Sequence, residues 1–262
     1  MLQWKTLRVE HGETRVATLA LNRPERRNAV NLELATELAQ CVSGLAQQRH
    51  LRVLVLTGEG SSFCAGGDLK ERLESGPSAA RRQRDMFLGA IDQLDRFPCP
   101  VLAMINGPAL AGGLELALGC DIRVASDAAA FGLPEVRTAG GFPGGGGPVR
   151  LAKLIGRGRT SLVVFTGRKF SADEAFGLGM VDKVVPAARL REETYTIAAE
   201  IALGSPAGMH GAKQLIRQSA DIDTASAIDL SRALRDPLDD TPDFHEAMRA
   251  WHGKRVPDFP DR

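Results

Sequence analysis

A short apolar run ends in Asn-Gly-Pro and passes through Ala111-Gly112-Gly113 into a helical pattern that carries one carboxylate, Glu115. The first N–H groups of a helix lack intrahelical partners and carry the positive end of the helix dipole. Two glycines let another molecule approach these N–H groups closely, so this helix start can hold a developing oxyanion about one turn from Glu115. A glycine-rich strand–helix connection, with a glutamate favoured by the dipole, is the structural alternative.

A second glycine pair precedes a carboxylate in the stretch FCAGGDLKE, residues 63–71. Gly66-Gly67 predicts a turn with accessible backbone, and Asp68 is a candidate cap for a helix that begins near Leu69. Exposed N–H groups can therefore meet a ligand here as well. An ordinary loop with an aspartate cap explains the same residues.

Another candidate catalytic carboxylate, Glu135, follows Glu115 by 20 positions. The chain between them predicts a helix and two short strands, which is enough to double back and bring the two carboxylates together. The run Gly140–Gly147 (GGFPGGGG) is too flexible for the interior of a helix or strand. We expect a loop that wraps a ligand or a neighbouring element, with a surface turn of no function as the alternative.

The elements that must position these residues alternate between strand and helix, which predicts an α/β fold. Helices are expected after Asn31 and after a capping box of Ser171 and Glu174. The expected strands are 16–22, 51–57, 101–105, 121–126 and 128–132, and a small break at 75–80 precedes a helix through 94. The pattern turns helical near Glu192, which predicts a core over residues 1–191 and a helical oligomerisation region over 192–262.

The composition argues against several classes of protein. With 33 basic and 32 acidic residues, the net charge of +1 argues against a nucleic-acid or membrane-surface partner. No apolar run approaches membrane-spanning length, and the first 13 residues lack a signal or transit pattern, so we expect a cytoplasmic protein. The four cysteines lack CxxC spacing and the five histidines lack paired spacing, which predicts buried free thiols and no metal site.

Several ordered motifs together make the chain resemble the crotonase superfamily, and most of all the enoyl-CoA hydratases. The motifs are LNRPERRNAVN (21–31), FCAGGDLKE (63–71), NGPALAGGLELALGCDIRVAS (106–126), FGLPE (131–135), TGRKFSADEAFGLGMVDKVVP (166–186) and HGKRVPDF (252–259). The resemblance implies a spiral of ββα units with two roughly perpendicular sheets. It also implies a C-terminal helical region and assembly as a homotrimer or a dimer of trimers.

The resemblance further implies where an acyl-CoA thioester would bind. The backbone N–H groups of Gly67 and Gly112 would form the oxyanion hole for the thioester carbonyl. The implied coenzyme A contacts are Ala65, Gly66, Gly67, Asp68 and Leu69, with Arg23, Arg26 and Lys254 as candidates for the phosphates. For the two arginines, solvated surface charge is the alternative.

Hydratases of this superfamily carry two catalytic glutamates, and the chain has both, as Glu115 and Glu135. The resemblance therefore implies hydration of a trans-2-enoyl-CoA, with Glu115 activating water for carbon 3 and Glu135 protonating carbon 2. No metal or redox cofactor is expected, because coenzyme A belongs to the substrate. The alternatives are an enoyl-CoA isomerase, another acyl-CoA reaction, or a non-catalytic relative that binds acyl-CoA or RNA. The run between Glu135 and Pro143 is one residue longer than in the common hydratase pattern, which leaves the acyl preference open.

Overall fold

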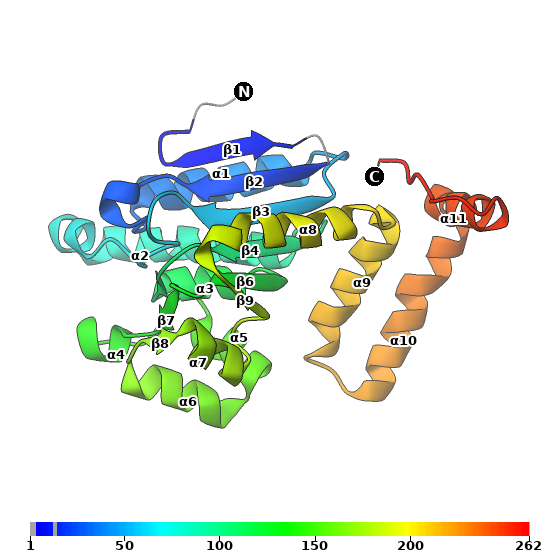
Figure 1. Cartoon of the computed structure of the whole chain (residues 1–262). Coiled ribbons are helices and arrows are strands. Elements are labelled where there is room, and N and C mark those ends of the chain that lie inside the picture. The colour runs from blue at the N-terminus through cyan, green and yellow to red at the C-terminus, as the bar shows by residue number, and fades with distance from the viewer. Residues whose placement is uncertain (1–3, 13–14, 262) are drawn as a thin grey trace.

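The computed structural model describes residues 4–12 and 15–261, and its centre is a six-stranded sheet (Figure 1). The strand order is β1-β2-β3-β4-β6-β9, in which β1 runs antiparallel to β2 and every other pair is parallel. The strands are β1 (Leu7–His11), β2 (Val16–Leu21), β3 (Val53–Gly58), β4 (Val101–Ile105), β6 (Ile122–Ser126) and β9 (Lys183–Val185).

A smaller sheet of three strands lies beside the large one. It contains β5 (Ala109–Leu110), β7 (Ala130–Gly132) and β8 (Phe170–Ser171), with β7 in the middle. β5 pairs with β7 in parallel, and β7 pairs with β8 in antiparallel orientation. The expected mixed α/β architecture with two sheets is thus confirmed.

Strands β2, β3 and β4 of the large sheet are buried on both faces, which explains why they read as continuous apolar runs. Along β3, Leu54 and Leu56 belong to the core shared with α1 (Leu32–Ala46) and α2 (Leu69–Asp95). The intervening Val53 and Val55 pack in a second cluster with residues of α8 (Leu190–Ala202). Because successive side chains of a strand point to opposite faces, this one apolar run supplies both cores.

The expected helix caps are present. The side chain of Asn31 accepts a hydrogen bond from the N–H of Leu34 at 2.9 Å, and that of Asp68 accepts one from the N–H of Glu71 at 3.3 Å. Ser171 and Glu174 form the expected capping box at the start of α7 (Ala172–Leu178). Local side-chain chemistry therefore fixes where these three helices begin.

The break expected at residues 75–80 is present as a kink at Gly76. One helix, α2, runs from Leu69 to Asp95 with a kink at Gly76, whose φ of +76° and ψ of 176° are not helical. Pro77 follows directly, and proline is tolerated in the first turn of a helix because its missing N–H is not needed there. The chain therefore restarts the helix at once instead of forming a loop.

The rest of the chain is mostly helical. The remaining helices are α3 (Gly112–Leu118), α4 (Glu135–Thr138), α5 (Gly147–Ile155), α6 (Arg157–Thr166), α9 (Pro206–Ser219), α10 (Thr224–Arg235) and α11 (Pro242–His252), with 3₁₀ turns at 24–26, 187–189 and 236–240. The boundary expected at residue 191 falls inside α8, which packs on the sheet, whereas α10 and α11 stand away from it at the right of Figure 1. The division into two regions stays a prediction.

The four cysteines are free and buried, as expected, and burial raises the pKa values of Cys41, Cys64 and Cys120 to about 12. In the described part of the chain, no helix is both long and apolar enough to cross a membrane. The same residues contain no group of three or more His, Cys, Asp or Glu side chains that could hold a metal ion. The expectation about a leader rests partly on residues 1–3 and 13, which lie outside the described residues.

Candidate active site

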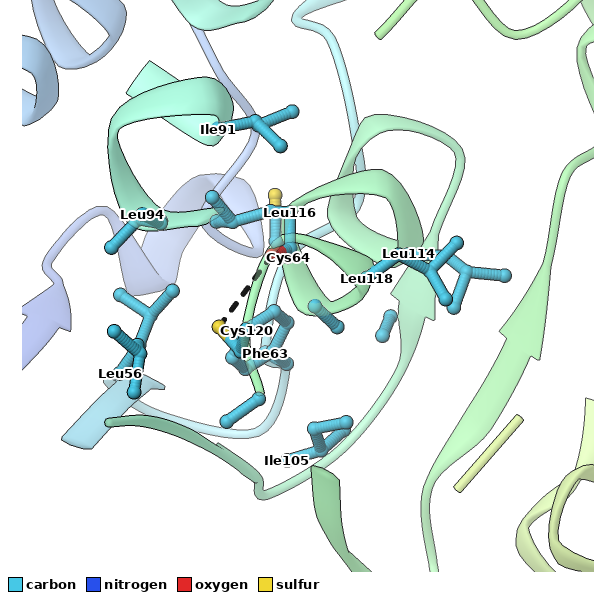
Figure 2. Packing of buried hydrophobic residues seen from close by; sticks show 14 of the residues in the cluster. Leu56, Phe63, Cys64, Ile91, Leu94, Ile105, Leu114, Leu116, Leu118 and Cys120 are labelled. Carbon is cyan, nitrogen blue, oxygen red and sulfur yellow. Dashed lines mark hydrogen bonds between the residues drawn. The ribbon is translucent and has the colours of Figure 1, made fainter. Parts of the chain in front are cut away.

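The short helix α3 carries Glu115 and is buried along its whole length. Figure 2 shows Leu114, Leu116 and Leu118 of α3 in one apolar cluster with Ile91 of α2. Glu115 lies among these leucines in the sequence and is itself only 3% exposed. Packing on all sides holds the helix, and with it the carboxylate, in one position.

The backbone is strained where α3 begins. Ala111, which precedes the helix, has φ +53° and ψ −126°, a conformation that residues with a side chain rarely adopt. Its N–H donates to the carbonyl of Gly132 in β7 at 2.8 Å, which ties the strained residue to the smaller sheet. Strain of this kind costs about 1–3 kcal/mol and concentrates at functional sites. The start of α3 is therefore held in place by the surrounding fold.

The two glycine stretches come together in the fold. A Cβ atom added to Gly66 would lie 3.1 Å from the nitrogen of Gly112, and one added to Gly112 would lie 3.8 Å from the nitrogen of Gly67. Neither the Gly67 nor the Gly112 N–H has a hydrogen-bond partner among the described residues. Two free backbone donors from separate parts of the chain therefore lie side by side, as an oxyanion hole requires.

Glu115 is held by a loop from further along the chain. Its Oε1 accepts hydrogen bonds from the N–H groups of Gly145 at 2.7 Å and of Gly147 at 2.8 Å. Burial raises the pKa of the Glu115 carboxyl, while these two N–H groups and the positive charges of Arg150 and Arg72 oppose the rise. The glycine-rich loop thus wraps a neighbouring element, which is one of the two roles expected for it.

Glu135 begins α4, just beyond the last strand residue of β7. Its Oε2 is buried and has no hydrogen-bond partner among the described residues. Burial raises the pKa of the Glu135 carboxyl to about 7, and the negative charge of the neighbouring Glu115 adds to this rise. A hydrogen bond from the N–H of Glu135 itself and the positive charge of Arg72 both oppose the rise. A carboxyl with a pKa near neutrality can both give and take a proton at physiological pH.

Arg72 connects these groups and was not identified from the sequence. A Cβ on Gly67 would lie 2.6 Å from the central carbon of the Arg72 guanidinium, so this side chain passes directly over Gly67. Its charge also acts on both Glu115 and Glu135. Gly67, Gly112 and the two glutamates therefore share one neighbourhood. The one sequence signal was the spacing, since Arg72 lies one turn after the cap residue Asp68.

Not all of the residues expected to contact coenzyme A lie near the candidate site. Asp68 caps α2 and forms an ion pair with Arg23 at 3.2 Å, in which both side chains are about 15% exposed or less, so Arg23 is not a solvated charge. Gly66 adopts a left-handed φ of +91°, and Arg26 is exposed. Lys254 is exposed and follows α11, and Figure 1 shows α11 at the right, away from α3.

Of the other expected contacts, Ala65 is half-buried and its N–H donates to the carbonyl of Arg27 at 3.0 Å. Leu69 is 56% exposed at the first position of α2. Ala65 directly precedes the glycine pair that approaches Gly112, and Leu69 follows that pair by two residues. The segment 65–69 thus combines an exposed apolar side chain with free backbone next to the candidate oxyanion hole.

The buried Glu115 and the half-buried Glu135 lie beside two free backbone donors on this two-sheet fold, and together these features define the class of protein. The chain belongs to the enoyl-CoA hydratase/isomerase family, whose model matches residues 11–262. It is 38% identical over 250 residues to the 2,3-dehydroadipyl-CoA hydratase of Escherichia coli, across 95% of this chain and 97% of that protein. It is also 37% identical to the enoyl-CoA isomerase/hydratase fer4 of Mycosarcoma maydis, across 94% of this chain and 93% of that one.

The structure of an enoyl-CoA hydratase from Bacillus anthracis superposes with a TM-score of 0.94 at 36% identity, covering 97% of this chain and 99% of that one. The resemblance to the crotonase superfamily and the crotonase fold are thereby confirmed. Which reaction of the family this chain catalyses depends on the site residues themselves.

Proposed function

We propose that the protein adds water across the double bond of a trans-2-enoyl-CoA and yields a 3-hydroxyacyl-CoA. The observation that carries this proposal is that Glu115, which is buried, and Glu135, whose Oε2 is buried, lie next to the free N–H groups of Gly67 and Gly112. Water addition to an unsaturated thioester needs a polarised carbonyl, a base for water and an acid for carbon 2. The two glycine N–H groups meet the first need, and Glu115 and Glu135 meet the other two.

The two glycine N–H groups stabilise the charge that develops on the thioester oxygen. When water attacks carbon 3, the electrons of the double bond move toward the carbonyl and an enolate forms. Donors fixed by the fold need no reorganisation at that moment, and each is worth roughly 10²–10³ in rate. The strained turn at Ala111 and the buried α3 supply this rigidity.

Glu115 acts as the base. Its Oε1 is engaged by Gly145 and Gly147, and Oε2 has no donor among the described residues, so Oε2 is the oxygen that takes the proton from water. A pKa raised by burial makes the carboxylate a stronger base than an exposed glutamate. The water oxygen bonds to carbon 3 as its proton passes to Glu115.

Glu135 acts as the acid. With its pKa raised to about 7, much of this carboxyl is protonated at neutral pH and can deliver its proton to carbon 2 of the enolate. Glu115 and Glu135 interact electrostatically and would share one water, so they titrate as a coupled pair. The net reaction adds one water molecule and returns both carboxyls to their starting protonation states once Glu115 passes a proton back to Glu135 through solvent.

The direct test is turnover of crotonyl-CoA by the purified protein, followed as loss of the enoyl absorbance. We expect turnover that persists after treatment with EDTA and without added redox cofactor, because N–H groups and carboxylates carry every step. Binding of coenzyme A thioesters without any turnover would instead support a non-catalytic acyl-CoA-binding protein.

Double-bond isomerisation is a second candidate, and Glu135 is the residue that favours it. A buried carboxyl with a free oxygen and a pKa of about 7 can carry a proton between carbon 4 and carbon 2 without a second group. A 3-enoyl-CoA substrate distinguishes the two reactions. Hydration predicts faster turnover of the 2-enoyl thioester, and isomerisation predicts faster turnover of the 3-enoyl thioester.

We also propose that the chain assembles as a homotrimer or a dimer of trimers through its C-terminal helices. Large apolar side chains are exposed along α8 to α11 and their connections, at Leu203, Ile216, Ile222, Ile228, Met248 and Trp251. Assembly would cover such residues and would be the means for Lys254 to approach the site of a second copy. Light scattering measures the mass directly, and a monomeric mass would overturn the proposal.

A further inference from the structure

Arg72 brings a positive charge to the site that the hydration steps do not use. The donors for the thioester oxygen are backbone N–H groups, and both proton transfers run through glutamates. Nevertheless the guanidinium of Arg72 lies over Gly67 and its charge reaches Glu115 and Glu135. The hydration steps therefore leave the role of the Arg72 charge unexplained.

The Arg72 side chain is anchored from the core. Its Nε donates to Oε1 of Gln83 at 2.8 Å, and Gln83 is only 2% exposed. The amide nitrogen of Gln83 in turn donates to the carbonyl of Val30 and, at 3.3 Å, to Glu71. A chain of hydrogen bonds from the buried side of α2 thus fixes the inner edge of the guanidinium and sets its orientation.

The outer edge of the same group is free. Among the described residues, neither terminal nitrogen of Arg72 has a hydrogen-bond partner, and no carboxylate lies within 4 Å of them. The second arginine near the pair differs, because Arg150 is engaged by Asp92 and by the carbonyl of Gly145. Arg72 therefore offers an unpaired, forked set of donors beside Gly67, close enough for its charge to act on both glutamates.

We propose that Arg72 recognises a second carboxylate on the acyl group, so that the preferred substrates are short enoyl-CoA thioesters with a carboxylate a few carbons beyond carbon 3. This inference rests on the proposed function and adds its substrate class. A guanidinium fork matches a carboxylate with two parallel hydrogen bonds, whereas an unpaired cation is a poor neighbour for an alkyl chain. Because the fork lies beside Gly67, which would bind the thioester end, only a short acyl group can present its carboxylate to it.

The kinetic test compares two thioesters of equal carbon number, trans-2-glutaconyl-CoA and trans-2-pentenoyl-CoA. The natural protein should have the higher kcat/KM for the glutaconyl thioester. In Arg72→Met this preference should fall by about ten- to a hundredfold, as expected for the loss of a charged hydrogen-bonded pair. Arg81→Met is the matched control, because Arg81 is an exposed arginine of the same helix, and it should leave the preference unchanged. The ratio does not depend on how much of each variant is folded.

Two results would overturn the inference. One is a natural protein that prefers pentenoyl-CoA, and the other is an Arg72→Met variant that loses activity equally on both thioesters, which would place Arg72 at the part that they share. Calorimetry with the saturated thioesters glutaryl-CoA and pentanoyl-CoA separates this proposal from hydration itself. Tighter binding of glutaryl-CoA that Arg72→Met abolishes supports the inference even without turnover, and equal affinities contradict it.

Discussion

The N–H of Gly145 donates to Oε1 of Glu115 at 2.7 Å, although the two residues lie 30 positions apart in the chain. Gly147 contributes a second N–H to the same oxygen, and a Cβ on either glycine would lie within 3 Å of the Glu115 side chain. The glycine-rich loop can therefore approach the carboxylate only because it carries no side chains there. These contacts hold the Glu115 carboxylate in one position, and catalysis by fixed groups requires this kind of preorganisation.

Replacement of either glutamate should remove most of the activity without unfolding the protein. Glu115→Gln and Glu135→Gln keep the shape of the side chain but can no longer exchange a proton, so we expect hydration to fall by about 10²–10⁴ in each. Initial rates with crotonyl-CoA measure the loss, and circular dichroism verifies the fold. A rate near that of the natural protein in either variant would mean that the assigned role is wrong.

The rate of hydration should fall as the pH rises above about 7. The pKa of Glu135 is raised to about 7, so its acidic proton is progressively lost in that range and the acid for carbon 2 disappears. A profile of kcat against pH checks this expectation. A rate that stays level from pH 6 to pH 9 would show that Glu135 does not have to be protonated.

The raised pKa of Glu135 also makes the free energy of unfolding depend on pH, and this dependence tests the pKa without measuring activity. A carboxyl whose pKa is higher in the folded than in the unfolded state binds more protons when folded, so its contribution is present below the unfolded pKa of about 4.5 and is lost as the pH rises toward 7. The free energy of unfolding of Glu135→Gln relative to the natural protein should therefore increase across this window. Parallel stability curves for the two proteins would contradict a raised pKa.

A single methyl group at Gly145 should disturb the position of Glu115. A Cβ there would lie 2.6 Å from Oε2 of Glu115, so Gly145→Ala must displace either the loop or the carboxylate. We expect kcat to fall about tenfold or more, in line with the sensitivity of catalysis to small displacements. Gly141→Ala is the matched control on the same loop, because its Cβ would meet nothing within 4 Å. Equal kcat values for the two variants would show that the loop does not position Glu115.

Arg150 is expected to act as a positioning residue. It donates to the carbonyl of Gly145 at 2.9 Å and pairs with Asp92 of α2, so it ties the loop that holds Glu115 to a rigid helix. In Arg150→Met we expect kcat to fall with little change in KM. The charge of Arg150 lowers the pKa of Glu115, so its removal should also shift the acidic limb of the pH profile upward.

Arg157→Met is the comparison for Arg150, because Arg157 is an exposed arginine at the start of α6. It should leave both kcat and the pH profile as they are. If Arg150→Met loses activity but the acidic limb does not move, the arginine supports the fold and does not tune Glu115.

The sequence predicted those features that local chemistry decides. Asn31, Asp68 and the capping box at Ser171 place helix starts through side-chain hydrogen bonds within three residues, and these placements are confirmed. The continuous apolar runs likewise predicted buried strands, because a strand that is covered on both faces needs apolar side chains at successive positions. The break expected at residues 75–80 is present as the kink of α2 at Gly76, but the sequence did not predict that the helix resumes directly at Pro77.

The features that the sequence did not predict depend on contacts between distant segments. The path of Arg72 is set by Gln83 and by the close approach of Gly67, and Gln83 itself is held by Val30, 53 positions away. The position of Arg72, one turn after Asp68, is the only local signal, and that spacing does not show which groups the Arg72 side chain contacts. Likewise, the sequence indicated that the loop glycines are flexible, but their hydrogen bonds to Glu115 depend on the tertiary fold.

An NMR spectrum of crotonyl-CoA incubated with the protein in D₂O tests most directly whether the protein adds water across the double bond. If Glu115 and Glu135 add water across the double bond, the product is 3-hydroxybutyryl-CoA with one deuteron at carbon 2. Recovery of unchanged crotonyl-CoA, or a shifted double bond without a hydroxyl group at carbon 3, would contradict the account.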